Sequence, residues 1–265
     1  MKRILLVMLV SAFTFGTMVS CNRKNLGAYL DIDSEINIKM IEVLGQHKKL
    51  QLDVQTERSY TCDHYYIDIV HRQSLNSIDI SFERIIIPDD CKAILKPASA
   101  TIDLGPLSDG VYNLNLSVGE VTHTGELIVS SDSYRVDFED NPAFNFTNTS
   151  FNKTPEHTIW GTIGYYRVQD ASALIQEFID DLIDLGAEKR SYIPGYYNRF
   201  TIGENGDIVK SNESSVYLFA QSFIFNYSGD IAKVEQLVKQ HTDYQGDMSI
   251  RVYTDKGEAF LSWIY

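Results

Sequence analysis

The chain has 265 residues, of which 44% are hydrophobic and 22% are charged, so its composition is that of a folded globular protein. Acidic residues outnumber basic residues by 36 to 23, and the resulting formal charge of -13 repels phosphate backbones and argues against a nucleic-acid partner. The length allows one large domain or two ordinary ones, and the repeats or spans of collagen, coiled coils and polytopic membrane proteins are missing.

The N-terminus has the pattern of a secretory signal. Basic residues precede an apolar stretch that is too short to be a membrane-spanning helix. The stretch ends in Met-Val-Ser-Cys at residues 18–21, which resembles the bacterial lipobox, whose Cys becomes the lipidated first residue after cleavage. We predict a signal peptide over residues 1–20, lipidation of Cys21 and a lipid-anchored tether over residues 21–40. Ordinary signal cleavage near this Cys is the alternative.

Two further cysteines, Cys62 and Cys91, remain in the mature chain. An even pair in an exported protein suggests a disulfide. Two separate buried thiols are the alternative, because the sequence does not place the two Cα atoms within bonding range. A metal site is disfavoured, since no second ligand cluster follows Cys62 at zinc-finger spacing.

Short runs of alternating apolar and polar residues fill residues 41–140. The clearest are residues 64–72, 77–87, 112–118 and 134–138. A period of two is typical of a sheet with one buried and one solvent-exposed face. Asp-Gly and other glycine-rich turns separate the runs, which predicts a β-sandwich.

One hexapeptide makes that prediction more specific. Residues 107–112, Leu-Ser-Asp-Gly-Val-Tyr, resemble a run found before a late strand of immunoglobulin-like domains. In that family the Tyr hydroxyl bonds back to the chain at a corner. The resemblance therefore implies an immunoglobulin-like sandwich and such a bond from Tyr112. The buried Trp of the family is missing from this half, and a meandering sheet of another type would show the same alternation.

A different pattern follows a predicted linker over residues 141–156, which is rich in Asn, Thr and Pro. Two amphipathic patterns predict helices, one that begins near Asp170 and one that begins at Ser228 or Asp230. Strand-like runs surround them in the order β-α-β-β-β-α-β-β. We therefore expect a second domain over residues 157–265, an α+β domain with two helices on one face of a mostly antiparallel sheet, similar to a ferredoxin-like fold.

No catalytic or cofactor motif is recognised. The Gly-x-Ser-x-Gly elbow, the P-loop and the His-Glu-x-x-His zinc motif are missing from the sequence. His64 and His71 lie too far apart along a predicted strand to share a metal. The acidic residues of the first predicted helix are typical of a solvated face. We assign no catalytic residue, no metal site and no cofactor.

An aromatic segment after the first predicted helix is the candidate ligand-binding site. Its members are Tyr192, Tyr196, Tyr197 and Phe200. Large rings in a loop are less easily explained as core. Exposed Tyr faces can stack on sugar rings or form the centre of a protein contact. The alternative is that these rings cover the end of the sheet.

The lipobox, the Asp-Gly-x-Tyr run and the acidic, aromatic-rich body together resemble Bacteroidetes-type envelope lipoproteins with an immunoglobulin-like module behind a lipidated Cys. The resemblance implies a lipid-anchored protein of the bacterial cell envelope, at the outer membrane and facing the periplasm or the surface. We expect a non-catalytic module that binds a glycan, a peptide or a partner protein. An envelope hydrolase with a carboxylate or His site assembled between the domains, and an assembly subunit, are the alternatives.

Overall fold

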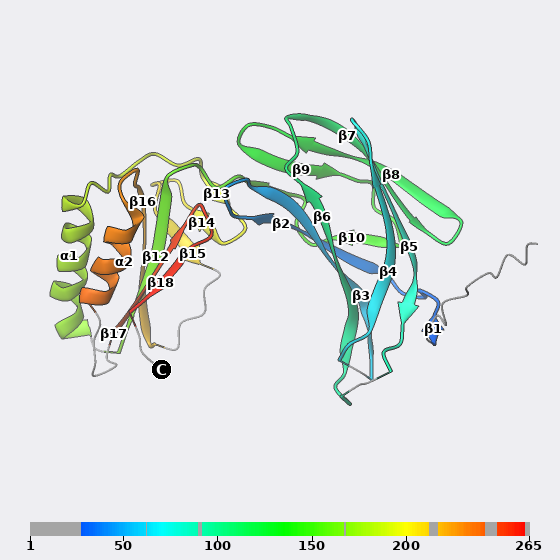
Figure 1. The fold of residues 1–265 in the computed structure, drawn as a ribbon, viewed down its shortest axis with the longest axis horizontal. Coiled ribbons are helices and arrows are strands. Elements are labelled where there is room, and N and C mark those ends of the chain that lie inside the picture. The colour runs from blue at the N-terminus through cyan, green and yellow to red at the C-terminus, as the bar shows by residue number, and fades with distance from the viewer. Residues whose placement is uncertain are drawn as a thin grey trace, which may run out of the picture.

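The computed structural model describes residues 28–61, 63–89, 92–166, 168–211, 217–241 and 248–262. Cys21, Cys62 and Cys91 fall outside these ranges, so the predicted lipidation and disulfide lie outside the described residues. The structure is mostly β, with 53% strand and 11% helix. Figure 1 shows two lobes, a large one made of strands and a smaller one that carries both helices.

The first lobe is a curled mixed sheet of eleven strands. Ten of them follow the order β10-β2-β3-β6-β4-β5-β7-β8-β9-β11, and β1 pairs with β5 beside that path. The strands are β1 (Tyr29–Leu30), β2 (Ile36–Val43), β3 (Lys49–Tyr60), β4 (Tyr66–Gln73), β5 (Ser77–Ile86), β6 (Lys96–Gly105), β7 (Gly110–Val118), β8 (Val121–Val129), β9 (Ser133–Asp137), β10 (Phe144–Phe146) and β11 (Ser150–Asn152). Strand β2 thus begins inside the predicted tether.

The core of this lobe lies inside the curl. Ile78 and Ile80 of β5, together with Leu114 and Leu116 of β7, are buried, while the residues between them face outward. The predicted alternation therefore identifies the buried face of these strands correctly. The curl brings strands that are distant in the sheet against one another. The ring of Phe144 on β10 lies 5.4 Å from that of Phe82 on β5.

The prediction of an immunoglobulin-like sandwich is wrong. Such a sandwich consists of two separate antiparallel sheets. Here one mixed sheet continues through parallel pairings of β5 with β7 and of β4 with β6, the latter reduced to the single pair Tyr66 and Ser99. The bond implied by the hexapeptide does form, because the Tyr112 hydroxyl donates to the carbonyl oxygen of Ser108 at 2.9 Å. A local corner of that family is therefore present in a different sheet.

The second lobe contains two sheets and two helices. Strands β12 (Thr158–Tyr165), β16 (Phe219–Asn226), β17 (Met248–Thr254) and β18 (Ala259–Leu261) form an antiparallel sheet in the order β16-β12-β17-β18. Strands β13 (Gly195–Tyr196), β14 (Phe200–Ile202) and β15 (Ile208–Ser211) form a small antiparallel sheet of their own. The helices are α1 (Val168–Asp184) and α2 (Ile231–Gln240). Within the described ranges, no helix has the length and apolarity needed to cross a bilayer.

The two faces of the four-stranded sheet carry separate clusters. Phe178 of α1 and Val234 of α2 pack with Ile163 of β12 in one cluster. Trp160 and Phe200 belong to a second cluster that includes residues of the small sheet. Figure 1 shows the helices on the side of the four-stranded sheet away from the large lobe.

The ferredoxin-like prediction is also wrong. That fold places the strands of both halves in one sheet. Here the three strands that follow α1 leave the main sheet, because Phe200 and Ile202 are buried in the cluster around Trp160. Element order alone does not distinguish a strand that joins the sheet from one that packs against its face.

Candidate functional site

The predicted aromatic site is mostly core. Tyr192, Tyr197 and Phe200 are 6%, 1% and 0% exposed. The Phe200 ring lies 5.1 Å from the ring of Trp160 and 5.2 Å from that of Tyr197. Tyr196 is partly buried and packs against the core of the first lobe. The rings thus join the small sheet to its neighbours, and little of their surface is left for a ligand.

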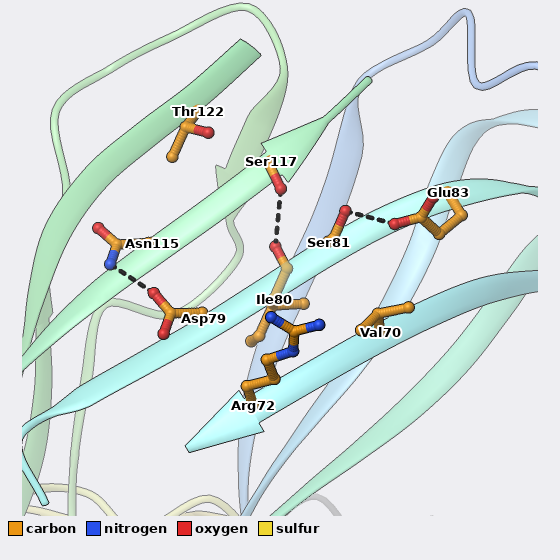
Figure 2. Close-up of a pocket in the computed structure, with 9 residues that line it drawn as sticks. All are labelled: Val70, Arg72, Asp79, Ile80, Ser81, Glu83, Asn115, Ser117 and Thr122. Atoms are coloured by element: carbon orange, nitrogen blue, oxygen red, sulfur yellow. Dashed lines mark hydrogen bonds between the residues drawn. The ribbon is translucent and has the colours of Figure 1, made fainter. Parts of the chain in front are cut away.

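One shallow hollow lies on the outer face of the large sheet, over β4, β5, β7 and β8 (Figure 2). Its volume is about 440 Å³. The polar side chains there largely bond to one another: Asn115 Nδ2 donates to Asp79 Oδ1 at 2.7 Å, and Ser81 Oγ donates to Glu83 Oε1 at 2.6 Å. All residues of this hollow belong to the first lobe, and several of their polar groups already bond to one another, which leaves fewer of them for a ligand.

The junction between the lobes offers a better candidate, and it is built around Thr154. Glu42 on β2 is 1% exposed and accepts the Thr154 N–H through Oε2 at 2.9 Å. The ammonium group of Lys48, in the turn between β2 and β3, donates to the Thr154 carbonyl oxygen. The β2–β3 hairpin of the first lobe therefore binds both backbone polar groups of one residue just before β12.

The second lobe contacts the same hairpin. Leu44, at the end of β2, packs against the cluster that contains Trp160. In the turn after β17, Gly257 has a φ of +82°, and a Cβ atom there would lie 3.2 Å from the Leu44 carbonyl oxygen. The Asp255 carboxylate accepts the N–H of His157 at 3.1 Å. Close packing of the second lobe against Leu44 therefore adds to the hydrogen bonds at Thr154, while the bond between His157 and Asp255 holds the adjoining part of the second lobe together.

Two adjoining hollows open at this junction, and we call them together the inter-lobe groove. They share Lys48 and Glu156. One hollow, of about 430 Å³, is lined by Gly45, Gln46, His47, Lys48, Pro106, Glu156, His157, Asp255 and Lys256. The other, of about 460 Å³, is lined by Lys48, Ser131, Asp132, Lys153, Thr154, Pro155, Glu156, Arg190, Ser191, Tyr192, Ile193 and Tyr197.

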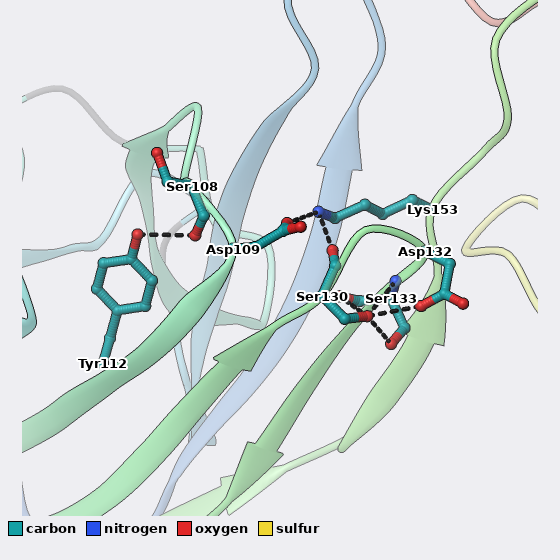
Figure 3. Close-up of polar contacts among 7 residues, drawn as sticks. All are labelled: Ser108, Asp109, Tyr112, Ser130, Asp132, Ser133 and Lys153. Atoms are coloured by element: carbon teal, nitrogen blue, oxygen red, sulfur yellow. Dashed lines mark hydrogen bonds and ion pairs between the residues drawn. The ribbon is translucent and has the colours of Figure 1, made fainter.

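Lys153 forms part of the wall and is held in place by the first lobe (Figure 3). Its ammonium group lies 3.5 Å from an Asp109 carboxylate oxygen, donates to the Ser130 carbonyl oxygen, and sits 4.7 Å from the centre of the Tyr134 ring. The Ser130 hydroxyl donates to Asp132 at 2.6 Å, and this bond holds the pKa of that exposed carboxyl below its usual value.

Burial dominates the ionisation of the groups behind the groove. It raises the pKa of Glu42 against the opposing effects of Thr154, Lys48 and Lys153. The other carboxylate oxygen of Glu42, Oε1, is buried and has no hydrogen-bond partner among the described residues. Burial also raises the pKa of Tyr192, which the neighbouring Thr158 hydroxyl partly offsets. These groups are buried supports, and the exposed charges of the groove are those of Arg190, Lys256, Asp132 and Glu156.

Comparison of the chain with protein-family models, with curated proteins and with solved structures finds no match. Within the described ranges, no three His, Cys, Asp or Glu side chains come together where they could hold a metal ion. A site between the domains was expected only under the hydrolase alternative, and no motif in the sequence identifies the residues of the groove. Lys48, Arg190 and Lys256 are far apart in the chain, and only the packing of the two lobes places Lys256 in one hollow, Arg190 in the other and Lys48 in both.

Proposed function

We propose that this protein is a lipid-anchored protein of the bacterial envelope that binds a ligand in the inter-lobe groove. The lipobox around Cys21 supports the anchor. One observation carries the binding role: both lobes supply walls to two adjoining hollows of about 430 and 460 Å³. Ligand sites of such size occur preferentially at interfaces between domains.

The groove is open, and charged and polar side chains lie in it beside apolar ones, which suits binding of a segment of a larger molecule. Its exposed members include Ser131, Asp132, Glu156 and Arg190. A glycan or peptide strand can lie across both hollows because they adjoin at Lys48 and Glu156. The hydrolase alternative gains no support from Glu42, the junction carboxyl with a raised pKa, because it is buried and accepts a backbone N–H.

The anchor is tested by labelling with radioactive palmitate. We expect incorporation into the native chain and none into Cys21→Ala. Equal labelling of both chains would contradict the anchor.

Binding is tested with the full chain in a neutral detergent, by calorimetric titration with envelope glycans and peptides. Ser191→Trp places an indole at the exposed rim of the groove and should abolish binding. Ser228→Trp adds the same ring at an exposed position outside the groove and should leave it unchanged. Equal binding by both variants would exclude the groove as the site.

A further inference from the structure

We infer that the ligand of the inter-lobe groove is an anionic saccharide, whose carboxylate or phosphate groups bind Arg190 and Lys256. The inference rests on the proposed function and names the chemistry of its ligand. It depends on basic side chains in the groove that lack a carboxylate partner and on the polar groups beside them.

The first step concerns the sign of the charge. The chain as a whole carries 36 acidic and 23 basic residues. The groove is less acidic: its basic members are Lys48, Lys153, Arg190 and Lys256, its acidic members are Asp132, Glu156 and Asp255, and Lys153 is paired with Asp109. Where the local charge is nearly balanced, an anion meets less repulsion than it does over the rest of an acidic surface. The groove is therefore a place where this acidic protein can bind an anion.

The second step concerns pairing. Among the residues that the structure describes, Lys48, Arg190 and Lys256 have no carboxylate oxygen within 4.0 Å. Lys48 donates to a neutral carbonyl, and the other two side chains are exposed. The planar guanidinium of Arg190 can bind both oxygens of a carboxylate or phosphate at once. Arg190 and Lys256 thus line the groove without a carboxylate partner, whereas Lys48 already bonds to Thr154 and lies close enough to Glu42 to act on its charge.

The third step distinguishes a saccharide from a continuous polyanion. Exposed carboxylates of Asp132 and Glu156 lie in the same wall as the cations. They would repel a ligand with charges at every position, yet they are good acceptors for hydroxyl groups. Ser131 and Ser191 add hydroxyls of their own, and Ile193, 52% exposed, offers apolar contact to the C–H groups of a sugar ring. A ligand with many hydroxyls and widely spaced anionic groups can bind the cations through its anionic groups and the carboxylates through its hydroxyls.

The probes are oligogalacturonate, its methyl ester, a phosphorylated hexose oligomer and polyglutamate, titrated into the full chain in neutral detergent. The acid and its ester share one backbone, so their difference reports the carboxylates alone. We expect the ester to bind at least about tenfold more weakly than the acid, and the affinity for the acid to fall as salt rises from about 50 to about 300 mM. Comparison of the uronate with the phosphate oligomer identifies which anionic group is preferred.

Two substitutions test the cations. Arg190→Ala and Lys256→Ala should each weaken binding of the acidic oligomer by about tenfold, as expected for loss of a charge-assisted hydrogen bond. Arg72→Ala and Lys233→Ala, at exposed positions outside the groove, are the matched controls and should leave binding unchanged. Lys48 is not substituted, because its bond to Thr154 supports the junction.

The outcomes separate the inference from the proposed function. Binding of a neutral saccharide or an uncharged peptide that Ser191→Trp abolishes would overturn the anionic ligand and keep the groove. Polyglutamate binding as tightly as the oligogalacturonate would overturn the saccharide. If no envelope component binds in a way that depends on Ser191, both the inference and the proposed binding role fail.

Discussion

The hydroxyl of Tyr112 donates to the carbonyl oxygen of Ser108, four residues earlier, at 2.9 Å. Tyr197 repeats the arrangement in the second lobe, where its hydroxyl donates to the carbonyl oxygen of Ile193 at 2.8 Å. Each Tyr has a Gly two positions before it, and each ring is buried. The bond therefore satisfies a hydroxyl that burial would otherwise leave without a partner.

Removal of either hydroxyl should weaken the fold. We expect Tyr112→Phe and Tyr197→Phe each to lower the free energy of unfolding by about 1 kcal/mol, the usual net value of such a bond. Urea denaturation measures the change. Because the two tyrosines lie in different lobes, the double variant should lose the sum if the chain unfolds as one unit. Tyr66→Phe, at a 51% exposed ring, is the control, and an equal loss there would contradict the role of the corners.

Glu42 should make stability depend on pH. Its pKa in the folded chain is raised above the ordinary value of 4.5, so the folded protein holds this proton more tightly than the unfolded chain does. The free energy of unfolding therefore falls as the pH rises from about 4.5 through the raised value, and levels off above it.

Glu42→Gln should remove that fall, because a Gln amide oxygen still accepts the Thr154 N–H and carries no charge. Urea midpoints between about pH 4 and about pH 8 measure the effect, with Glu57→Gln at an exposed position as the control. A fall with rising pH that stays as steep in the Glu42→Gln variant as in the native chain would exclude Glu42 as its source.

Gly161 allows two strands to approach closely. A Cβ atom at this position of β12 would lie 2.1 Å from the Arg251 carbonyl oxygen and 2.4 Å from the Phe223 ring. Backbone that close cannot move aside without shifting β17, so Gly161→Ala should lower the free energy of unfolding by about 1–3 kcal/mol. Gly45→Ala is the matched control, because its nearest atom outside neighbouring residues is 3.8 Å away. Thermal unfolding of both variants measures the difference. Equal stability of the two variants would show that β12 and β17 can move apart at little cost.

Alternation in the sequence predicted which side of a strand is buried, but it did not predict the neighbours of that strand. Ile78 and Leu114 were correctly expected on the buried faces, and they lie opposite each other in a parallel pair. A period of two is the same in parallel and antiparallel sheets, so it carries no information about that pairing. The bond of Tyr112 was predictable because its two partners lie close together in the chain.

The site was harder to predict than the fold. The aromatic segment attracted attention by composition, yet Phe200 and Ile202 alternate with Thr201, and this is the pattern of a strand with one buried face. Arg190 and Lys48 have no pattern of their own, since neither belongs to a motif. Their proximity depends on how two separately packed lobes meet at Thr154, and a single sequence carries no period or spacing that reports such a meeting.

The parallel pairing of β10 with β2 has a kinetic consequence. Asn145 Nδ2 donates to Asn37 Oδ1 at 2.8 Å across 108 positions of chain. Contacts between such distant residues form slowly, because the intervening chain must lose its freedom first. During synthesis from the N-terminus, the edge of β2 that pairs with β10 stays unpaired until residues 144–146 have been made. During that interval the edge can pair with another molecule, so delayed emergence of residues 144–146 would favour aggregation through β2.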